Sequence, residues 1–242
     1  NKAALQTQKE RLQANLLRAV SHDLRTPLTN ISGSADMLMQ EESALDPAIR
    51  KKLYTAIYDD TNWLINMTEN LLVATDLETN KESFKMSPEL IEDLFQSVVA
   101  HLDRRATEHH ISVHLEDATL MAAMNARLIQ RVIINIMNNA IQYTPKESNI
   151  ELSAVKKGNV VQISVTDDGP GIPNDAKKRL FDLFYTAGQG KADCQRGLGL
   201  GLNLCQSIVA MHGGKIDVLD HMPAGTTFQF TLHLVSAEEV KY

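Results

Sequence analysis

Residues 135–144 read Asn-Ile-Met-Asn-Asn-Ala-Ile-Gln-Tyr-Thr and lie on a predicted helix. The surrounding stretch Ala126–Tyr143 has the apolar spacing of an amphipathic helix. Asn135 and Asn139 are four residues apart, so their amides share one helical face. Amide carbonyl oxygens suit a hard cation such as Mg²⁺, which takes few protein ligands. The pair therefore predicts a metal site. For this motif alone, the ordinary polar face of a helix remains the alternative.

A second motif, Asp167-Asp168-Gly169-Pro170-Gly171, directly follows the strand-like run Val160–Val165. A carboxylate at the end of a strand can accept a hydrogen bond from an exocyclic amine, such as the one adenine carries. The glycines allow the backbone to approach a base closely. Because Asp-Gly and Gly-Pro are also common turn pairs, a plain turn remains the alternative.

The third motif, Gly197-Leu198-Gly199-Leu200-Gly201-Leu202, opens a predicted helix. Free N–H groups and the helix dipole favour a phosphate there. The spacing differs from the dinucleotide fingerprint and from the P-loop. The polar segment Tyr185–Arg196 precedes it and is suited to act as a lid over bound nucleotide. A weaker signal, Gly225-Thr226-Thr227-Phe228, opens the last strand, where Gly225 makes room for a helix end or for the lid.

Around these motifs, strand-like runs alternate with amphipathic stretches. Such a mixture over about 160 residues predicts a two-layer α/β sandwich. The predicted strands are Ile111–Leu115, Ile150–Val155, Val160–Val165, Lys215–Val218 and Thr226–Leu234. The predicted amphipathic stretches are Ser87–Thr107, Ala126–Tyr143, Asp175–Phe184 and Leu200–His212.

The N-terminal part has the pattern of two long helices. The first runs from Ala3 to about Met39. A turn follows, in which Asp46 is a predicted N-cap and Pro47 the first helical residue. The apolar residues of the second helix repeat at spacings of four and three, with Asp60 interrupting them, as in a bundle seam. These residues are Leu53, Ile57, Leu64, Met67 and Leu71.

Two long helices joined by a short loop predict an antiparallel helical hairpin. One hairpin cannot cover two apolar faces, so we expect a homodimer in which two copies form a four-helix bundle. The alternative is that the hairpin packs on the downstream domain. The predicted domains are residues 1–82 and 83–242, which makes the fold class an α-helical bundle followed by an α/β domain.

The composition of the chain limits which kinds of partner it is expected to bind. The chain has 242 residues, of which 43% are hydrophobic, and a net charge of -6. This charge gives no electrostatic reason to expect a nucleic-acid partner or an anionic membrane. The two cysteines, Cys194 and Cys205, have no metal-ligand spacing. No apolar run approaches the roughly 20 residues that span a bilayer, so we expect this stretch not to be membrane-spanning.

The motifs form a recognisable set when they are taken in order. The pairs Asn135…Asn139 and Phe181…Phe184, with Asp167-x-Gly-x-Gly, Gly197-x-Gly-x-Gly and Gly225-Thr, resemble five sequence boxes of one ATPase superfamily. Histidine kinases, Hsp90, type II topoisomerases and mismatch-repair ATPases share these N, G1, F, G2 and G3 boxes. The resemblance implies the Bergerat ATP-binding fold, with ATP and Mg²⁺ as cofactors.

The same resemblance implies roles for individual residues. Asn139 is the main metal ligand with Asn135 assisting, Asp167 binds the adenine amine, and the amides of Gly199 and Gly201 lie at the phosphates. The implied nucleotide-binding set is Asn135, Asn139, Tyr143, Asp167, Gly169, Gly171, Phe184, Arg196, Gly197, Gly199, Gly201 and Thr227.

Two positions depart from the kinase pattern. Kinases of this type often have a basic residue where Gln142 stands, and often an arginine where Thr186 stands. The cation that neutralises the γ-phosphate is therefore not assigned by the resemblance. Arg196 and Lys191, in the predicted lid, are hypothetical substitutes.

The first predicted helix contains Ser21-His22-Asp23-Leu24-Arg25-Thr26-Pro27-Leu28, which resembles the H box of histidine kinases. The wider stretch 16–29 resembles the Kdp-type potassium-responsive sensor kinases. The resemblance implies that His22 accepts the γ-phosphate and passes it to an aspartate on the receiver domain of a response regulator. A neutral imidazole is a good nucleophile near neutral pH, and Asp23 can fix its tautomer.

Thr26 lies one turn from His22, and its hydroxyl could orient a water for phosphatase chemistry, a role the resemblance implies. Pro27 removes one helical hydrogen bond, and it marks either a kink beside the phosphoacceptor or a helix end. The predicted catalytic residues are thus His22, Asp23 and Thr26.

We therefore predict the catalytic core of a sensor histidine kinase, the cytoplasmic portion of a membrane-anchored bacterial sensor. Two alternatives remain at this stage. One is a mechanical ATPase of the Hsp90 or topoisomerase type. The other is a nucleotide-binding scaffold without activity.

Overall fold

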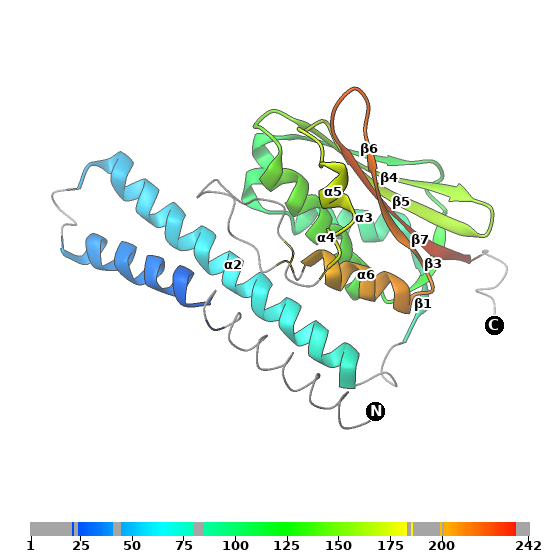
Figure 1. Ribbon diagram of the computed structural model, residues 1–242, viewed down its shortest axis with the longest axis horizontal. Coiled ribbons are helices and arrows are strands. Elements are labelled where there is room, and N and C mark those ends of the chain that lie inside the picture. The colour runs from blue at the N-terminus through cyan, green and yellow to red at the C-terminus, as the bar shows by residue number, and fades with distance from the viewer. Residues whose placement is uncertain are drawn as a thin grey trace. The chain divides into compact units, whose positions relative to one another are not determined.

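The computed structural model describes residues 21, 24–40, 45–79, 85–182, 185, 199 and 201–235. The chain divides into two compact units, Asn1–Thr79 and Asn80–Tyr242 (Figure 1). Within the described residues, no helix combines the length and apolar character that crossing a membrane requires.

The first unit is an antiparallel helical hairpin, as predicted (Figure 1). Residues 24–40 are helical on both sides of Pro27, so the alternative of a helix end at that proline is wrong. The second helix, α2 (Pro47–Thr79), begins at the predicted residue. The Asp46 carboxylate accepts a hydrogen bond from the Ala48 amide at 2.7 Å, which confirms Asp46 as the N-cap.

The predicted seam forms the less exposed side of α2. Met67 is buried, and Asp60 is only 2% exposed, so the seam tolerates a carboxylate at its centre. Four of the five seam residues are followed directly by a large apolar residue that is exposed. These four exposed residues are Tyr54, Tyr58, Ile65 and Leu72.

The second unit is built on one seven-stranded sheet with strand order β1-β3-β7-β5-β4-β2, and β6 pairs with β7. Only the β2–β4 pair is parallel. The strands are β1 (Ser87–Leu90), β2 (His110–Leu115), β3 (Met121–Met124), β4 (Asn149–Lys157), β5 (Val160–Asp167), β6 (Ile216–Asp220) and β7 (Thr226–Val235). The helices are α3 (Ile91–Ala100), the 3₁₀-helix η2 (Arg104–Glu108), α4 (Ala126–Tyr143), α5 (Asn174–Lys177) and α6 (Gly201–Met211).

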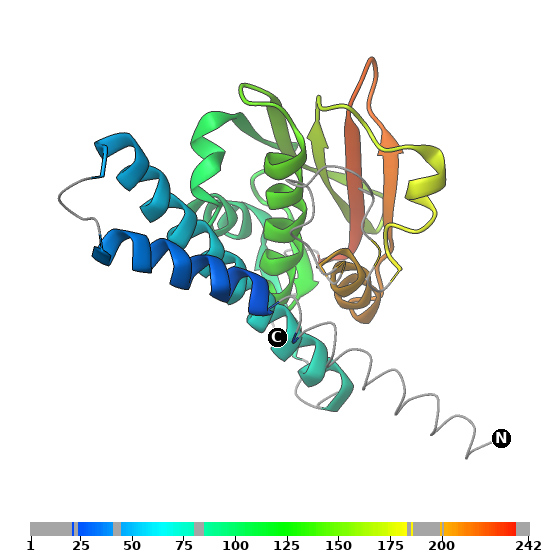
Figure 2. The same ribbon diagram turned by 60° about the vertical axis from the view of Figure 1, so that its left-hand side comes forward.

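The longer helices α3, α4 and α6 cover one face of the sheet (Figures 1 and 2), which confirms the predicted two-layer α/β sandwich. Strand β5 shows the arrangement most clearly, because buried and half-buried residues alternate along its whole length. The core between the layers is closed by large, fully buried side chains. Among them are Phe95, Ile133, Ile136, Met137, Ile208 and Phe230.

Two predicted helices differ from the structure. The stretch Ser87–Thr107 contains β1, then α3 and η2, because its first four residues pair with β3. In the stretch Asp175–Phe184, which the structure describes as far as Asp182, the only helix is the short α5. Turns follow α5 in which an amide bonds the carbonyl three residues earlier. The Arg179 amide, for example, donates to the carbonyl of Ala176. Strand β3 was not predicted, because four residues of small and sulfur-containing side chains show no period.

Candidate nucleotide-binding site

Helix α4 carries the asparagine motif and is fixed at its N-terminus by two hydrogen bonds. The Asn125 side chain accepts from the Leu128 amide at 3.2 Å and caps the helix. The main-chain amide of Asn125 donates to Nε2 of His212 at 3.0 Å, and His212 directly follows α6. The apolar side of α4 faces the core, which leaves Asn135 and Asn139 half-buried on its other side.

The asparagine motif meets the third glycine motif at the start of α6. Asn135 Nδ2 donates to Cys205 Sγ at 3.8 Å. A Cβ placed on Gly201, the first residue of α6, would lie 4.0 Å from Asn135 Cγ. Cys205 is fully buried, and this burial raises the pKa of its thiol to about 12. Two motifs that are far apart in the sequence are therefore neighbours.

Asp167 ends strand β5 and is 7% exposed. The Gly169 amide donates to Asp167 Oδ1 at 3.0 Å. Burial, the largest influence, raises the pKa of the Asp167 carboxyl, and the charge of Asp168 adds to this. The hydrogen bonds from the amides of Gly169 and Thr226 act in the opposite direction. Asp167 is thus a buried carboxylate with oxygen lone pairs left to accept from a ligand.

The glycines of the second motif allow tight packing around Asp167. A Cβ on Gly169 would lie 2.6 Å from Thr144 Cγ2, so this turn abuts the end of α4. A Cβ on Gly225 would lie 1.9 Å from the Asp167 carbonyl oxygen, and Gly225 has φ 131°. Gly225 therefore makes room for the backbone of Asp167. Most of the predicted lid lies outside the described residues, so the prediction that Gly225 makes room for a helix end or the lid stays a prediction.

Helix α4 joins the two clusters. Asn135 lies beside Gly201, at the start of α6, and Thr144, the C-cap of α4, packs against Gly169. The two residues are nine positions apart, or about 14 Å along a helix at 1.5 Å per residue. A ligand that contacts both clusters must therefore be elongated, with one end beside Asp167 and the other beside Asn135.

The remaining predicted residues are placed as follows. Tyr143 is 49% exposed, and Gly171 has φ 76° beside the carbonyl of Gly225. Thr227 lies within the sheet, its hydroxyl 3.0 Å from that of Thr166. Gly199 is half-buried with φ 63°.

Several predicted residues lie outside the part of the chain that the structure describes. They are His22, Asp23, Phe184, Thr186, Lys191, Arg196 and Gly197. Of the predicted catalytic residues, only Thr26 is described, and it is exposed on the first helix.

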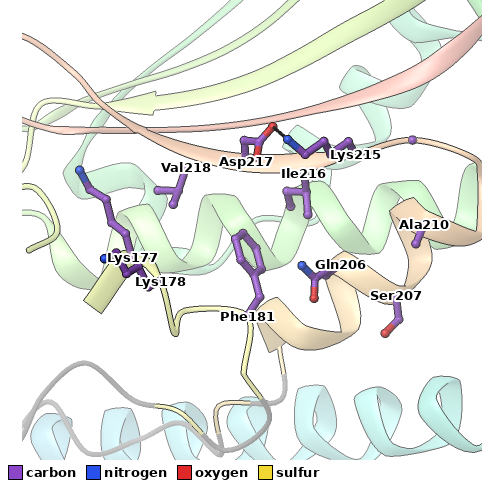
Figure 3. A pocket seen from close by; sticks show the side chains of 11 residues that line it. Lys177, Lys178, Phe181, Gln206, Ser207, Ala210, Lys215, Ile216, Asp217 and Val218 are labelled. Atoms are coloured by element: carbon purple, nitrogen blue, oxygen red, sulfur yellow. Dashed lines mark ion pairs between the residues drawn. The ribbon is translucent and has the colours of Figure 1, made fainter. Parts of the chain in front are cut away.

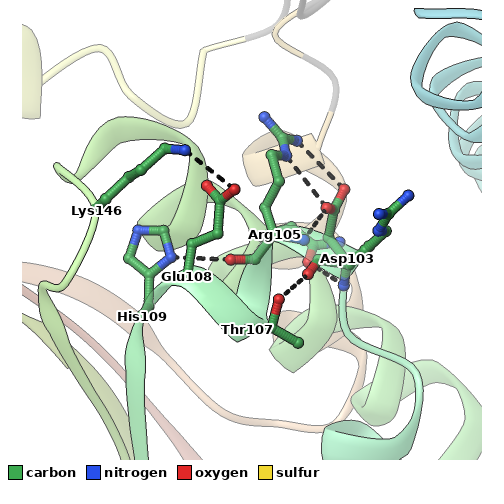
Figure 4. Close-up of polar contacts among 8 residues, drawn as sticks. Asp103, Arg105, Thr107, Glu108, His109 and Lys146 are labelled. Carbon is green, nitrogen blue, oxygen red and sulfur yellow. Dashed lines mark hydrogen bonds and ion pairs between the residues drawn. The ribbon is translucent and has the colours of Figure 1, made fainter. Parts of the chain in front are cut away.

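A polar cluster around η2, which the motifs did not reveal, includes Asp103 and Arg105 (Figure 4). The Asp103 amide donates to Asn138 Oδ1 at 3.3 Å. Burial acts to raise the pKa of Asp103, but hydrogen bonds from Arg105 outweigh it and hold that pKa below its usual value. Asn138 Oδ1 already accepts this hydrogen bond, whereas Asn135 bonds Cys205 through its nitrogen, so the amide oxygens of Asn135 and Asn139 are the ones offered to a ligand.

The donor set fits Mg²⁺. Among the described residues, no three His, Cys, Asp or Glu side chains are grouped so that they could hold a metal ion. Mg²⁺ commonly binds with one or two protein oxygens and completes its shell with water and phosphate oxygens. The amide oxygens of Asn135 and Asn139, one turn apart on α4, match this requirement.

A cavity of about 720 Å³ lies elsewhere in the second unit, between α5, α6 and β6 (Figure 3). Its lining includes Lys177, Phe181, Gln206, Lys215 and Val218. Phe181 belongs to the predicted F box, but of the predicted nucleotide-binding residues that the structure describes, none lines this cavity.

Comparisons with known proteins agree with this geometry. Residues 12–80 match the His Kinase A (phospho-acceptor) domain, and residues 124–236 match the family of histidine kinase-, DNA gyrase B- and HSP90-like ATPases. The sensor protein KdpD of Clostridium acetobutylicum is 37% identical over 231 residues. The match covers 96% of this chain and 26% of that protein, so the chain spans about a quarter of its relative's length.

Two solved structures are similar over most of the chain. The histidine kinase ThkA in complex with the response regulator protein TrrA has a TM-score of 0.66 and 26% identity. That match covers 94% of this chain and 64% of ThkA. Full-length ShkA in complex with AMPPNP has a TM-score of 0.63 and 25% identity, and covers 92% of this chain and 46% of ShkA.

The second unit is thus an ATP-binding domain of the histidine kinase, gyrase and HSP90 type. With a phosphoacceptor domain ahead of it, the chain contains the two domains of a histidine kinase core, and it is similar in sequence to the sensor protein KdpD.

Proposed function

We propose that this chain transfers the γ-phosphoryl group of ATP to its own His22 and then to an aspartate on the receiver domain of a response regulator. The main support is the geometry of α4, which brings Asn135 against the glycine motif of α6 and Thr144 against the turn after Asp167. The match of residues 12–80 to a phosphoacceptor domain favours a kinase over a mechanical ATPase.

In this proposal the adenine lies at Asp167, whose carboxylate accepts from the exocyclic amine in a buried setting. Gly169 and Gly171 let the backbone approach the base, and Tyr143 and Thr227 flank the site. The amides of Gly197, Gly199 and Gly201 contact the phosphates at the start of α6. Phe184 and Arg196 complete the site from the segment before α6. The complex of ShkA with AMPPNP supports ATP as the nucleotide.

Asn139 and Asn135 would hold Mg²⁺ through their amide oxygens. A bound Mg²⁺ would neutralise phosphate charge and orient the triphosphate. Catalysis of phosphoryl transfer depends mainly on such positioning and charge neutralisation. The role of the two asparagines is therefore to keep two oxygens fixed on one face of α4, with the proper spacing.

At the phosphoacceptor, the lone pair of His22 Nε2 attacks the γ-phosphorus. The bond from that phosphorus to the β–γ bridging oxygen breaks, and ADP leaves with the electron pair. Asp23 holds the Nδ1–H, which keeps Nε2 unprotonated for the attack. In the second transfer, a carboxylate oxygen of the regulator's aspartate attacks the phosphorus and the N–P bond breaks. The Thr26 hydroxyl orients a water that later hydrolyses the aspartyl phosphate.

The hairpin is suited to dimerisation. Tyr54, Tyr58, Ile65 and Leu72 form an exposed apolar stripe on α2. A second copy of the hairpin would cover this stripe in a four-helix bundle. Residues 1–82 would then form the dimerisation and phosphotransfer domain, and residues 83–242 the catalytic domain. The similarity to KdpD supports a place as the cytoplasmic portion of a membrane-anchored, Kdp-type sensor.

The test is incubation with γ-labelled ATP and Mg²⁺. The protein should acquire an acid-labile, base-stable label, and His22→Ala should remain unlabelled. Label that persists in His22→Ala would contradict the assignment. ATP hydrolysis without protein labelling would favour the mechanical ATPase instead.

A second experiment tests the cation at the γ-phosphate. Arg196→Ala should raise the KM for ATP or lower kcat, because the triphosphate would lose a compensating charge. Unchanged kinetics would exclude this role for Arg196, and the same measurement on Lys191→Ala would test the other candidate.

A further inference from the structure

Cys205 lies behind the asparagine motif, and its contacts determine which way one amide faces. The Cys205 thiol donates to the main-chain carbonyl of Val132 at 3.7 Å, one turn before Asn135 on α4. Asn135 Nδ2 donates to the same sulfur at 3.8 Å. Both contacts are buried or half-buried between α4 and α6.

The direction of these hydrogen bonds follows from counting protons. A thiol has a single hydrogen, and Val132 takes it. Toward Asn135 the sulfur can therefore act only as an acceptor. An amide has two N–H donors on nitrogen and no donor on oxygen, so the nitrogen side of Asn135 must face the sulfur. The carbonyl oxygen Oδ1 then points away from Cys205.

From these contacts we infer that Cys205 is a positioning residue: its sulfur holds the amide of Asn135 in the one orientation that presents Oδ1 to the metal. This inference rests on the proposed function, in which Asn135 assists Asn139 as a ligand. Without the sulfur acceptor, the amide can rotate by half a turn and present N–H groups, which repel a cation. Cys205 does not touch nucleotide or metal and acts only through Asn135.

The position of Cys205 also couples two motifs. Cys205 lies one turn after Gly201, whose α-carbon faces Asn135. A bond from α6 to the side chain of Asn135 and another to the backbone of α4 fix the two helices to each other. A displacement of α6 would therefore change the orientation of Asn135 together with the position of the glycine amides.

The experiment uses the 242-residue chain with Cys194→Ser, so that Cys205 is the only thiol. The affinity for a fluorescent ATP analogue is measured with and without Mg²⁺. Cys205→Val keeps the volume similar but removes the acceptor. We expect the Mg²⁺-dependent gain in affinity to fall by about two- to fivefold, the value of one weak hydrogen bond, with the Mg²⁺-free affinity unchanged. Cys205→Ser, which keeps a donor and an acceptor, should recover most of the gain.

A control and a reference variant separate the possible failures. Val209→Ala, also buried on α6, should lower the melting temperature without changing the Mg²⁺ dependence. A wild-type Mg²⁺ dependence in Cys205→Val overturns the inference, and so does an equal loss of affinity without Mg²⁺. Asn135→Ala is measured in parallel. If it too leaves the Mg²⁺ dependence unchanged, the proposed role of Asn135 fails and the inference fails with it.

A spectroscopic measurement does not depend on replacing Cys205. The S–H stretching band of Cys205 should report a thiol bonded to a carbonyl, and it should stay near that position in Asn135→Leu. A shift of the band to that of a free thiol in Asn135→Leu would show that the thiol donates to Asn135 instead of Val132. The orientation argued above would then be wrong.

Discussion

The hairpin exposes large apolar side chains, whereas the sandwich buries most of its own. On α2, Tyr54, Tyr58, Ile65 and Leu72 are each about half exposed or more. In the sandwich, side chains of comparable size, such as Phe95 and Phe230, are almost fully inaccessible. A sheet covered by one layer of helices closes its core within a single chain, whereas two helices leave a face open. The sandwich therefore closes its core within one chain, whereas the hairpin leaves an apolar stripe exposed, as expected if a second copy covers it.

The largest expected effect is that of Gly225→Ala, which should destabilise the sandwich and leave the hairpin folded. In Gly225→Ala the new Cβ would lie 1.9 Å from the Asp167 carbonyl oxygen, at a φ of 131° that side chains rarely adopt. We expect a loss of more than about 4 kcal/mol in the stability of the sandwich, as for other backbone clashes. Thermal unfolding followed by circular dichroism should show the strand signal of the sandwich lost while helical signal remains. The fluorescence of Trp63, the chain's single tryptophan, which lies on α2, should still report a folded hairpin.

The matched control is Gly33→Ala in the hairpin. A Cβ there meets nothing within 4 Å, and alanine is favoured over glycine in a helix by about 1 kcal/mol. This variant should therefore raise the melting temperature of the hairpin slightly. If Gly225→Ala melts like the wild type, the close approach of β7 to the end of β5 is wrong.

The next prediction tests whether the open face of the hairpin is a dimer interface. Ile65→Glu places a charge in the middle of the exposed stripe. In a two-fold dimer each substitution counts twice, so a loss of about 2 kcal/mol per copy raises the dimer Kd about 1000-fold. Sedimentation equilibrium measures this change. Lys52→Glu, an exposed residue on another face of α2, should leave the Kd unaltered. Equal dissociation constants for the two variants would contradict this role of the stripe.

A third prediction compares two adjacent carboxylates of the sandwich. Asp167→Asn should lower nucleotide affinity about 10- to 100-fold, the usual value of a hydrogen bond to a charged group. The melting temperature at neutral pH should stay equal or rise, because burial raises the pKa of Asp167 and its charge destabilises the fold. Isothermal titration calorimetry and thermal melts measure the two effects.

Asp168→Asn provides the opposite pattern. The Asp168 carboxylate accepts from the Asn149 side chain at 2.6 Å and from its amide at 2.9 Å, and these bonds lower its pKa. This variant should lose stability and keep its nucleotide affinity. If Asp168→Asn loses affinity as Asp167→Asn does, the adenine contact has been placed on the wrong carboxylate.

The sequence predicted features that depend on local periodicity. The face of α4, the seam of α2, the cap at Asp46 and the strand before Asp167 all follow from spacings of two to four residues, and the structure has each of them. The contacts that assemble the site were not predictable in this way. Cys205 and Asn135 are 70 residues apart, and only the packing of α6 on α4 brings them together.

The role of Gly225 was missed for the same reason. Its environment is the carbonyl oxygen of Asp167, which reaches it through the pairing of β5 with β7. Strands β1 and β3 escaped prediction because each is only four residues long. A short edge segment is defined by its partner strand, and its own side chains show too few repeats to reveal a period.

The smallest expected effect is a difference between the two units in how their thermal stability depends on pH. His212 is buried and held by two bonds, with Nδ1 bonded to the Ile208 carbonyl at 2.7 Å and Nε2 accepting from the Asn125 amide. Burial lowers the pKa of His212 below 6.5, although the bond to Ile208 acts to raise it. Above about pH 6.5 the imidazole is neutral in both the folded and unfolded chain. Below that pH the unfolded chain binds a proton first, so stability falls until the lower pKa of the folded state is reached.

Thermal melts between pH 7.5 and about pH 5 should therefore show the sandwich transition moving to lower temperature. His212→Gln, which cannot be protonated, should lower stability at every pH but flatten this slope, and the exposed His233→Gln should not. The hairpin has a single histidine, His22, so the hairpin transition should move much less over the same range. A sandwich transition that keeps its full slope in His212→Gln would mean that another group, not the link between α6 and the cap of α4, controls this pH dependence.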